Sequence, residues 1–229
     1  MLDNLDRGDR GEVKVFPEFD LEWQKYYDKL SPRFGDLTSR LRARQRVFAF
    51  VGPRAIGKSY YIDRLIARYA GMLEGVKTNT TRKREPRDDI GRQAYNFMTP
   101  EDFGLGIKDG YFLEHDIYFG NHYGSSISEI YKVLDRGLHG IFAITPPGSA
   151  KLFEWRSKIN LSIICLRPES VEVLLKNYDR RGIVDLGKRE QYLSETKNFL
   201  PPNGVDYQTV WISGCLETDE ARLVDALRL

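Results

Sequence analysis

The sequence predicts an α/β fold of three layers, in which a parallel sheet lies between helices and carries a smaller antiparallel insertion. From residue 46 onward, short runs rich in Val, Ile and Phe alternate with longer amphipathic stretches. This alternation is typical of parallel strands joined by right-handed helical crossovers. A glycine-rich loop at residues 52–59 follows the first apolar run and precedes the first amphipathic stretch, which favours the same fold.

Four apolar runs have the length and the β-branched composition of buried parallel strands. They cover residues 47–51, 140–145, 161–166 and 209–212. The amphipathic stretches predict helices at residues 59–70, 126–136, 147–156, 168–180, 188–199 and 217–229. Two helix start signals are also present. Pro100 stands at a first helical position after Thr99, and Ser126 is followed by Glu129 in the pattern of a capping box.

Residues 76–126 break this rhythm and are predicted to form the insertion. The segment is rich in Tyr, Phe, Thr and Gly. Strand-like pieces cover residues 111–119 and 122–125, and Gly120-Asn121 between them is a hairpin-type turn. We therefore expect a small, mostly antiparallel sheet between the first helix and the second parallel strand.

The composition excludes several classes of function. The 35 basic and 33 acidic residues give a formal net charge of +2, so an extended cationic surface for nucleic acid is not expected. No apolar stretch reaches the roughly 18 residues of a membrane-spanning helix, and the first 22 residues lack the apolar core of a secretory signal. Cys165 and Cys215 are the only cysteines, so no disulfide framework is expected and a reducing cytoplasm fits the sequence.

Residues 1–45 differ from the rest and are predicted to be an N-terminal extension of a domain that covers residues 46–229. Short helices are expected at residues 21–27 and 36–46, on either side of Pro32. The extension could cover an active site, mediate dimerisation or bind a partner. The sequence leaves both its role and the oligomeric state open.

The glycine-rich loop fits the phosphate-binding pattern G-x-x-x-x-G-K-[ST] in the strand–loop–helix context that the pattern requires. Its residues are Gly52, Pro53, Arg54, Ala55, Ile56, Gly57, Lys58 and Ser59. The glycines let backbone N–H groups cradle phosphate oxygens at the positive end of the following helix. Lys58 would reach the β- and γ-phosphates, and the Ser59 hydroxyl would ligate Mg²⁺. The loop predicts a nucleoside triphosphate ligand but does not identify the phosphoryl acceptor.

Further motifs follow this phosphate loop in a characteristic order. They are Thr80-Thr81-Arg82, Tyr95-Asn96-Phe97, Phe112-Leu113-Glu114 and Gly120-Asn121-His122-Tyr123-Gly124-Ser125. Together with the loop, they make the chain resemble the guanylate kinase family over about residues 46–229. The resemblance implies a core, a nucleoside-monophosphate-binding region at about residues 76–126 and a lid at about residues 180–189. It also implies transfer of the γ-phosphoryl group of ATP to GMP or dGMP.

The resemblance assigns acceptor binding to seven residues. They are Thr78, Arg82, Arg87, Tyr95, Glu114, Tyr123 and Ser125. The arginines can grip a phosphate bidentately, and the tyrosine hydroxyls can donate to it. A carboxylate at Glu114 can accept from guanine N1–H and the 2-amino group, Thr78 can donate to O6, and Ser125 helps to orient the base. Adenine would place an acceptor nitrogen against the carboxylate and would be rejected.

A second cluster of arginines resembles the lid of the family. Arg181 and Arg189 match its cations and, with Lys58, are the predicted catalytic residues, while Arg180 is the alternative lid arginine. Cations delivered by lid closure would stabilise the negative charge that spreads over the transferred phosphoryl group.

The sequence departs from the family pattern at the end of the second apolar run and in the lid. Ala143 and Thr145 stand where the family carries acids, and Asn177 stands where the lid has its first arginine. Mg²⁺ would then rest on Ser59, phosphate oxygens and water, or borrow an acid such as Asp116. Two alternatives stay open: a kinase of the same fold with a different nucleotide or phosphorylated acceptor, and a non-catalytic guanylate kinase-like binding module.

Overall fold

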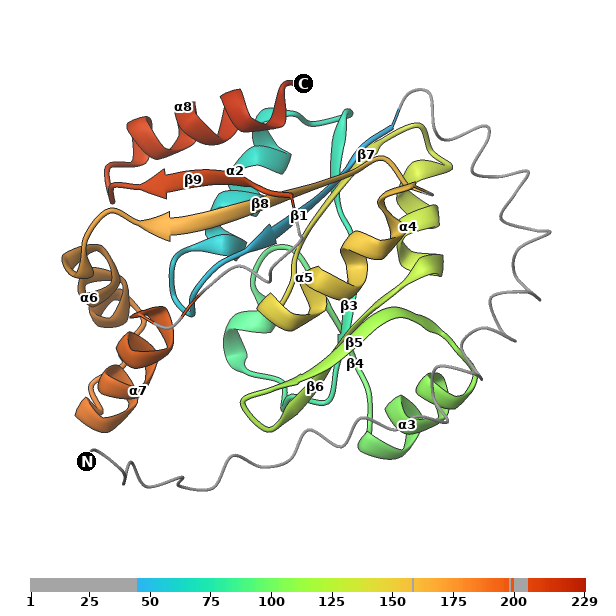
Figure 1. The fold of residues 1–229 in the computed structure, drawn as a ribbon, viewed down its shortest axis with the longest axis horizontal. Coiled ribbons are helices and arrows are strands. Elements are labelled where there is room, and N and C mark those ends of the chain that lie inside the picture. The colour runs from blue at the N-terminus through green and yellow to red at the C-terminus, as the bar shows by residue number, and fades with distance from the viewer. Residues whose placement is uncertain (1–44, 158, 198, 200–205) are drawn as a thin grey trace, which may run out of the picture.

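The computed structural model describes residues 45–157, 159–197, 199 and 206–229 (Figure 1). The predicted N-terminal extension and its two short helices lie outside the described residues, which begin at residue 45. Among the helices of the described part of the chain, none combines the length and hydropathy that a membrane span requires.

The central sheet has five parallel strands in the order β2-β7-β1-β8-β9. Their bounds are β1 Val47–Val51, β2 Leu73–Gly75, β7 His139–Ala143, β8 Leu161–Pro168 and β9 Gln208–Ile212. Every residue of β1 is buried because this strand lies in the middle of the sheet, which explains its uninterrupted apolar sequence. The predicted parallel sheet is therefore confirmed. Strand β2 adds an edge strand that the apolar runs did not predict.

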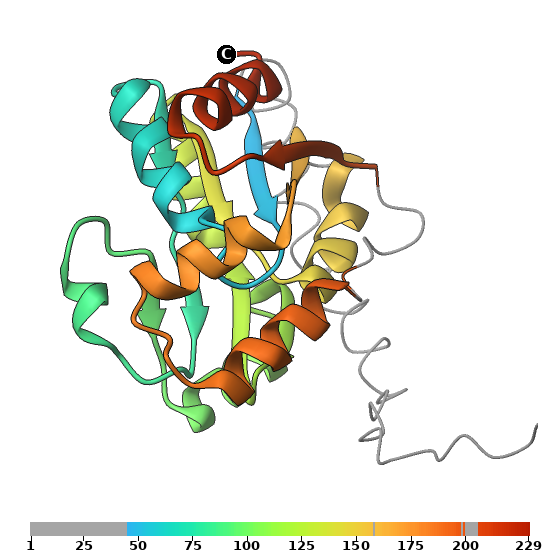
Figure 2. The ribbon, with the colours of Figure 1, turned by 90° about the vertical axis from the view of Figure 1, so that its left-hand side faces the viewer.

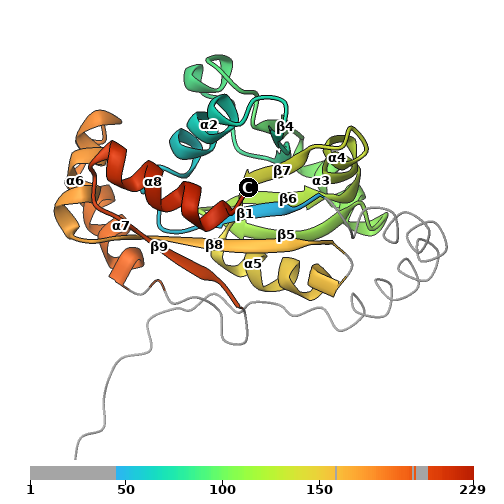
Figure 3. The same cartoon turned by 90° about the horizontal axis from the view of Figure 1, so that it is seen from above.

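Helices cover both faces of this sheet and complete the three layers (Figure 3). The helices on the face that receives Phe48 and Phe50 of β1 are α2 (Lys58–Arg68), α6 (Val171–Arg180) and α8 (Leu216–Leu227). The helices on the face that receives Val47, Ala49 and Val51 are α4 (Ile127–Leu134) and α5 (Pro146–Phe153). Because strand side chains alternate between faces, β1 contributes to both cores. Helix α7 (Leu186–Lys197) follows α6 and lies next to it (Figure 2).

Two predicted boundaries move by a few residues for local reasons. Thr145, expected at the end of a strand, is the N-cap of α5 and accepts a hydrogen bond from the Gly148 amide at 3.1 Å. Pro168, expected to start a helix, is instead the last residue of β8, and α6 begins after Ser170. The short 3₁₀ helix η2 (Glu154–Ser157) continues α5 to the predicted end of that helix.

The insertion forms a second sheet of four strands in the order β4-β3-β6-β5. Their bounds are β3 Thr78–Thr80, β4 Tyr95–Phe97, β5 Phe112–Tyr118 and β6 Asn121–Ser126. The β3–β6 and β5–β6 pairs are antiparallel and the β3–β4 pair is parallel, so the sheet is mixed but mostly antiparallel, as predicted.

One face of the second sheet is covered by α3 (Pro100–Lys108). The rings of Phe103 in α3 and Phe112 in β5 stack with centres 4.3 Å apart. Gly124 makes this approach possible, because a Cβ at that position would lie 2.8 Å from the Phe112 ring. The Thr99–Pro100 start signal is confirmed, since Thr99 Oγ1 accepts a hydrogen bond from the Asp102 amide at 3.0 Å. The opposite face remains for the polar side chains described below.

The hairpin turn between β5 and β6 is centred one residue earlier than predicted. Tyr118 pairs with Asn121, so the two loop residues are Phe119 and Gly120 rather than Gly120 and Asn121. Both loop residues have positive φ, +51° and +71°, which is the backbone of a two-residue turn that matches the strand twist. A phenylalanine rarely adopts this conformation, which explains why the sequence misplaced the turn.

The capping box predicted for α4 does not form. Ser126 occupies the N-cap position, but its side chain makes no capping hydrogen bond. Ser126 is still paired with Phe112 at the end of β6, and its hydroxyl accepts from Ser128 at 3.3 Å. Glu129 pairs with Lys132 instead of reaching back to the cap.

The two cysteines are both free thiols in different environments. Cys165 is fully buried in β8, and this burial raises the pKa of its thiol to about 11. Cys215 is exposed at the N-cap of α8, where hydrogen bonding with Thr218 lowers the pKa of its thiol.

Candidate active site

The phosphate loop leaves the carboxyl end of β1, the middle strand of the central sheet, and leads directly into α2. Gly52 is required by packing, because a Cβ there would lie 2.6 Å from the Leu166 carbonyl oxygen. Gly57 is required by conformation, since its φ is +105° at the N-cap of α2. Ala55 also has a positive φ, +62°, and its carbonyl accepts a hydrogen bond from Asn177 Nδ2 at 3.0 Å. The loop is therefore held in one shape by its neighbours.

Lys58 folds back across the loop. Its Nζ donates to the carbonyl oxygens of Gly52 and Pro53 at 2.8 and 3.0 Å. Burial, together with the nearby positive charges of Arg181 and Arg54, lowers the pKa of Lys58 to about 7. An anion bound in the loop would favour the charged form of Lys58. The neighbouring residue, Ser59, is exposed at the start of α2.

The strand residues predicted to bind the acceptor all lie on one face of the second sheet. The register places Thr78 beside Tyr95, Glu114 beside Ser125, and Tyr123 beside both Thr80 and Asp116. Strand positions two residues apart share a face, so these side chains form one polar surface opposite α3. The residues that this surface brings together are Thr78, Tyr95, Glu114, Tyr123 and Ser125.

Glu114 is buried, with 4% of its surface exposed, against the first turn of α5. A Cβ at Gly148 would collide with its carboxylate. Burial, with a smaller contribution from the nearby Asp116, raises the pKa of Glu114 to about 7, although Ser125 and Lys151 oppose the rise. The Ser125 hydroxyl faces the carboxylate without reaching normal hydrogen-bond geometry. Glu114 therefore lies near the midpoint of its titration at neutral pH.

Asp116 lies beside Thr145, the position where the family pattern has an acid. Burial raises the pKa of Asp116, and hydrogen bonding with the Ile117 backbone and Thr145 partly offsets this. One of its carboxylate oxygens is buried without a hydrogen-bond partner in the described residues. An acid carried by the second sheet thus stands next to the strand end that lacks one.

Arg82 lies next to Tyr95, and its charge is matched by two acids. Its guanidinium donates to both carboxylate oxygens of Asp88 at 2.8 and 3.0 Å and lies 3.4 Å from Glu85. Burial alone would lower the pKa of Arg82, yet the hydrogen bonds and charges of these acids raise it. The guanidinium also lies 5.2 Å from the centre of the Tyr95 ring. A phosphate bound at Arg82 would have to exchange with Asp88.

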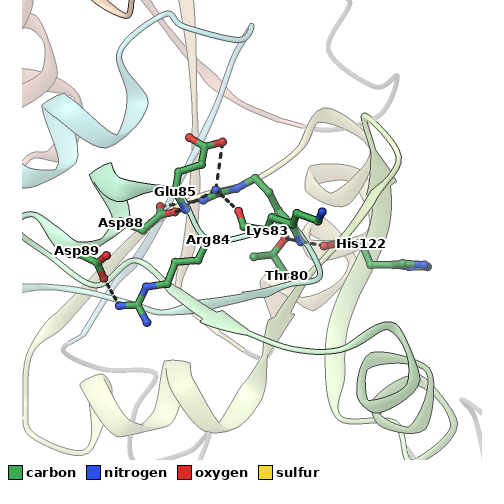
Figure 4. Close-up of polar contacts among 8 residues, drawn as sticks. Thr80, Lys83, Arg84, Glu85, Asp88, Asp89 and His122 are labelled. Carbon is green, nitrogen blue, oxygen red and sulfur yellow. Dashed lines mark hydrogen bonds and ion pairs between the residues drawn. The ribbon is translucent and has the colours of Figure 1, made fainter.

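The acids that engage Arg82 were missed by the sequence reasoning. Asp88 belongs to the 3₁₀ helix η1 (Pro86–Asp89), which also contains Arg87. Figure 4 shows Asp88 and Glu85 beside each other and Asp89 pointing toward Arg84. Asp88 accepts from the Glu85 amide at 2.7 Å, and the next acid in η1, Asp89, pairs with Arg84. Pro86 followed by acids is a start signal for a short helix, so the sequence carried a usable indication.

The lid residues are not equivalent in the structure. Arg181 ends α6 close enough to Lys58 to lower its pKa. Arg189 is turned toward its own segment, where it pairs with Asp179 and donates to the Ile183 carbonyl at 2.6 Å. Arg180 is exposed, with a long contact of 3.5 Å to Asn177. Of the three arginines, Arg181 is the one that the structure brings toward the phosphate loop.

The described residues contain no group of three acid, histidine or cysteine side chains arranged to hold a metal ion. The oxygen donors that the site offers are the exposed Ser59 hydroxyl and the partly unpaired carboxylate of Asp116. Oxygen donors of this kind fit Mg²⁺, which usually keeps several waters and binds the phosphates of its nucleotide.

A parallel sheet with a phosphate loop at its middle strand, joined to a second sheet with a polar face, defines a P-loop α/β protein of the nucleotide-kinase class. The sequence model of the guanylate kinase family matches residues 44–198, and the chain belongs to this family.

The relatives are distant in sequence. A guanylate kinase of Chlorobium luteolum is 29% identical over 140 residues, which cover 61% of this chain and 70% of the relative. One of Chlorobium chlorochromatii is 28% identical over 155 residues, covering 66% and 78%. The crystal structure of guanylate kinase from Anaplasma phagocytophilum matches with a TM-score of 0.54 at 20% identity, over 81% of this chain and 86% of that one, and supports the fold.

Proposed function

We propose that the chain is an ATP-dependent kinase that transfers the γ-phosphoryl group of ATP to GMP or dGMP. The observation that carries the proposal is the row formed by Thr78, Ser125 and Glu114 across three neighbouring strands of the second sheet. Each of these side chains is at least nine-tenths buried. A buried row of two hydroxyls and one carboxylate favours a ligand with matching polar groups, because unmatched groups would be costly.

Guanine is the base that matches this row. Its N1–H and 2-amino groups can donate to the Glu114 carboxylate, while its O6 can accept from the Thr78 hydroxyl. Adenine has an acceptor at N1 and no 2-amino group, so it would leave the carboxylate unmatched. The Arg82, Tyr95 and Tyr123 side chains lie farther along the same face, where they would receive the monophosphate.

The transfer itself would use the residues of the phosphate loop and of α6. A phosphate oxygen of the acceptor attacks the γ-phosphorus of ATP, and the bond from that phosphorus to the β–γ bridging oxygen breaks to release ADP. Lys58 and Arg181 supply positive charge beside the transferred group. Arg189 would join them after exchanging Asp179 for a phosphate oxygen. Mg²⁺, held by Ser59, phosphate oxygens and water, would neutralise charge on the donor phosphates.

The proposal is tested with the purified chain, Mg-ATP and a panel of nucleoside monophosphates. ADP should form in response to GMP and dGMP and much less in response to AMP, CMP or UMP, with GDP and dGDP as the identified products. Lys58→Met should lower kcat at least about 100-fold, because a charge that stabilises the transition state is removed. Absence of GMP- and dGMP-dependent ADP formation would overturn the proposal.

A different acceptor is the second candidate. It is favoured by the pairing of Arg82 with Asp88 and Glu85, which opposes a simple monophosphate at that position. Turnover of another phosphorylated acceptor in the same panel would support it. Tight nucleotide binding without any turnover would instead indicate a non-catalytic module. We infer a cytoplasmic location, because the two cysteines of the sequence provide no disulfide framework.

A further inference from the structure

Arg54 of the phosphate loop contacts two aromatic rings from other elements. Its guanidinium carbon lies 4.3 Å from the centre of the Phe119 ring and 5.0 Å from the centre of the Tyr192 ring. The two rings meet edge to face with centres 5.5 Å apart. Phe119 is at the tip of the β5–β6 hairpin and Tyr192 is in α7. This arginine clamp, formed by Arg54, Phe119 and Tyr192, therefore joins the phosphate loop to two separate elements.

The backbone conformation of Phe119 is unfavourable for a residue with a large side chain. Phe119 has a φ of +51° in a two-residue turn, a conformation that glycine and asparagine adopt far more readily. Strained residues of this kind persist where the surroundings hold them, and they cluster at functional sites. Beyond its own hairpin, Phe119 contacts the Arg54 guanidinium and the Tyr192 ring.

The charge of Arg54 is left available for a ligand. In the described part of the chain, no carboxylate forms an ion pair with Arg54, in contrast to Arg82 and Arg189. Arg54 is close enough to Lys58 to lower the pKa of that lysine. The guanidinium thus lies beside the lysine that would contact the β- and γ-phosphates, and it is contacted by two aromatic rings. Its charge also opposes the burial-driven rise in the pKa of Glu195, but the two side chains form no ion pair in the described structure.

We propose that Phe119 and Tyr192 are positioning residues that hold Arg54 for the donor phosphates. The hairpin that carries the acceptor residues and the helix after the lid segment would then control how tightly the donor nucleotide binds. This inference rests on the proposed function, because it takes the loop to hold a nucleoside triphosphate. A guanidinium that contacts the face of an aromatic ring keeps N–H groups at its edge free, so Arg54 can donate to a phosphate while it remains in contact with the rings.

The test measures the affinity of the full chain for the β,γ-imido analogue of ATP with Mg²⁺, in the absence of any acceptor. Phe119→Leu and Tyr192→Leu should each weaken binding about threefold to thirtyfold, although neither residue is in the phosphate loop. Phe119→Tyr keeps a ring and should restore the affinity. In an Arg54→Ala background, Phe119→Leu should have no further effect, because the residue that it positions is gone.

A matched control and a strain control accompany these variants. Phe153 in α5 stacks on Arg156 at the same 4.3 Å, so Phe153→Leu removes an equivalent contact elsewhere and should leave donor affinity unchanged. Phe119→Gly removes the ring but suits the positive φ, so the Tm should not fall while donor affinity falls as in Phe119→Leu.

The outcomes separate this inference from the proposed function. Unchanged donor affinity in both ring variants would overturn the clamp, as would an equal loss in Phe153→Leu. If the ring variants weaken binding of the ATP analogue but the unmodified chain does not turn over GMP, the arginine clamp is supported and only the assigned acceptor is overturned. Absence of donor binding in the unmodified chain would overturn both.

Discussion

Glu114 is the residue of the candidate site with the clearest expected pH signature. Its pKa is raised to about 7, so it is mostly protonated below that pH and mostly ionised above it. Guanine N1–H and 2-amino groups need the ionised form as their acceptor. We therefore expect GMP affinity to increase with pH through 7 and to fall by up to about tenfold for each pH unit below it.

This expectation is checked by the Kd for GMP between about pH 5.5 and pH 8.5. Glu114→Gln is the comparison, because the phosphate of GMP titrates equally in both proteins. The variant should bind GMP about 10- to 100-fold more weakly at high pH, show a shallower pH slope and discriminate less against AMP. The same slope in both proteins would remove Glu114 from base recognition.

At the scale of residues, chemistry within a strand was easier to predict than chemistry between segments. Thr78, Glu114 and Ser125 were identified from short motifs, and their shared face follows from strand alternation. The contact between Asp116 and Thr145 was only partly predictable, because it depends on β5 lying beside the start of α5. The contact of Arg54 with two rings could not be predicted, since those rings come from distant parts of the chain.

The short helix η1 carries the acid that engages Arg82, the proposed phosphate-binding arginine. Asp88, in η1, holds Arg82 through two hydrogen bonds, and both side chains are about 10% exposed. We expect Asp88→Asn to lower the KM for GMP about three- to tenfold with little change in kcat, because the acceptor phosphate would no longer compete with a carboxylate.

Asp89→Asn is the matched control, since Asp89 lies in the same 3₁₀ helix but pairs with the exposed Arg84. Steady-state kinetics with Tm measurements on both variants decide the question. A higher KM in Asp88→Asn at unchanged Tm would show that Asp88 positions Arg82 for phosphate rather than blocking it.

At the scale of elements, periodicity predicted the regular structures, and tertiary contacts decided their ends. The fully buried β1 and the amphipathic helices follow directly from their patterns. The three-residue strand β2 has too little sequence to stand out, and it becomes a strand because β7 pairs with it. The failed capping box shows the same limit, because Ser126 is still engaged in the β6 ladder where α4 begins.

At the scale of the whole molecule, the buried carboxylate of Asp219 joins α2 to the segment between β9 and α8. Asp219 is fully buried and accepts from the Ser213 and Gly214 amides, the Ser213 hydroxyl and the Tyr61 hydroxyl, all within 3.0 Å. Tyr61 belongs to α2, so the helix that opens with the phosphate loop is anchored to the start of α8.

Tyr61→Phe should lower the free energy of unfolding by about 1.5–3 kcal/mol, because a buried charge loses one of its donors. Urea denaturation gives this value directly. Tyr60→Phe is the control, since Tyr60 is the neighbouring residue and is 52% exposed. This variant should change the free energy of unfolding by less than about 0.5 kcal/mol. Equal effects in the two variants would contradict the role given to Asp219.

Because one cysteine thiol is buried and the other is exposed, their rates of modification can report opening of the central sheet. Cys215 is open to solvent before α8, whereas Cys165 lies inside β8 between β1 and β9. Alkylation of Cys215 therefore proceeds in the folded protein, while alkylation of Cys165 requires the middle of the central sheet to open. The delay between alkylation of Cys215 and alkylation of Cys165 therefore reports how often β8 becomes accessible next to β1, the strand that leads into the phosphate loop. The measurement needs no substitution in the protein.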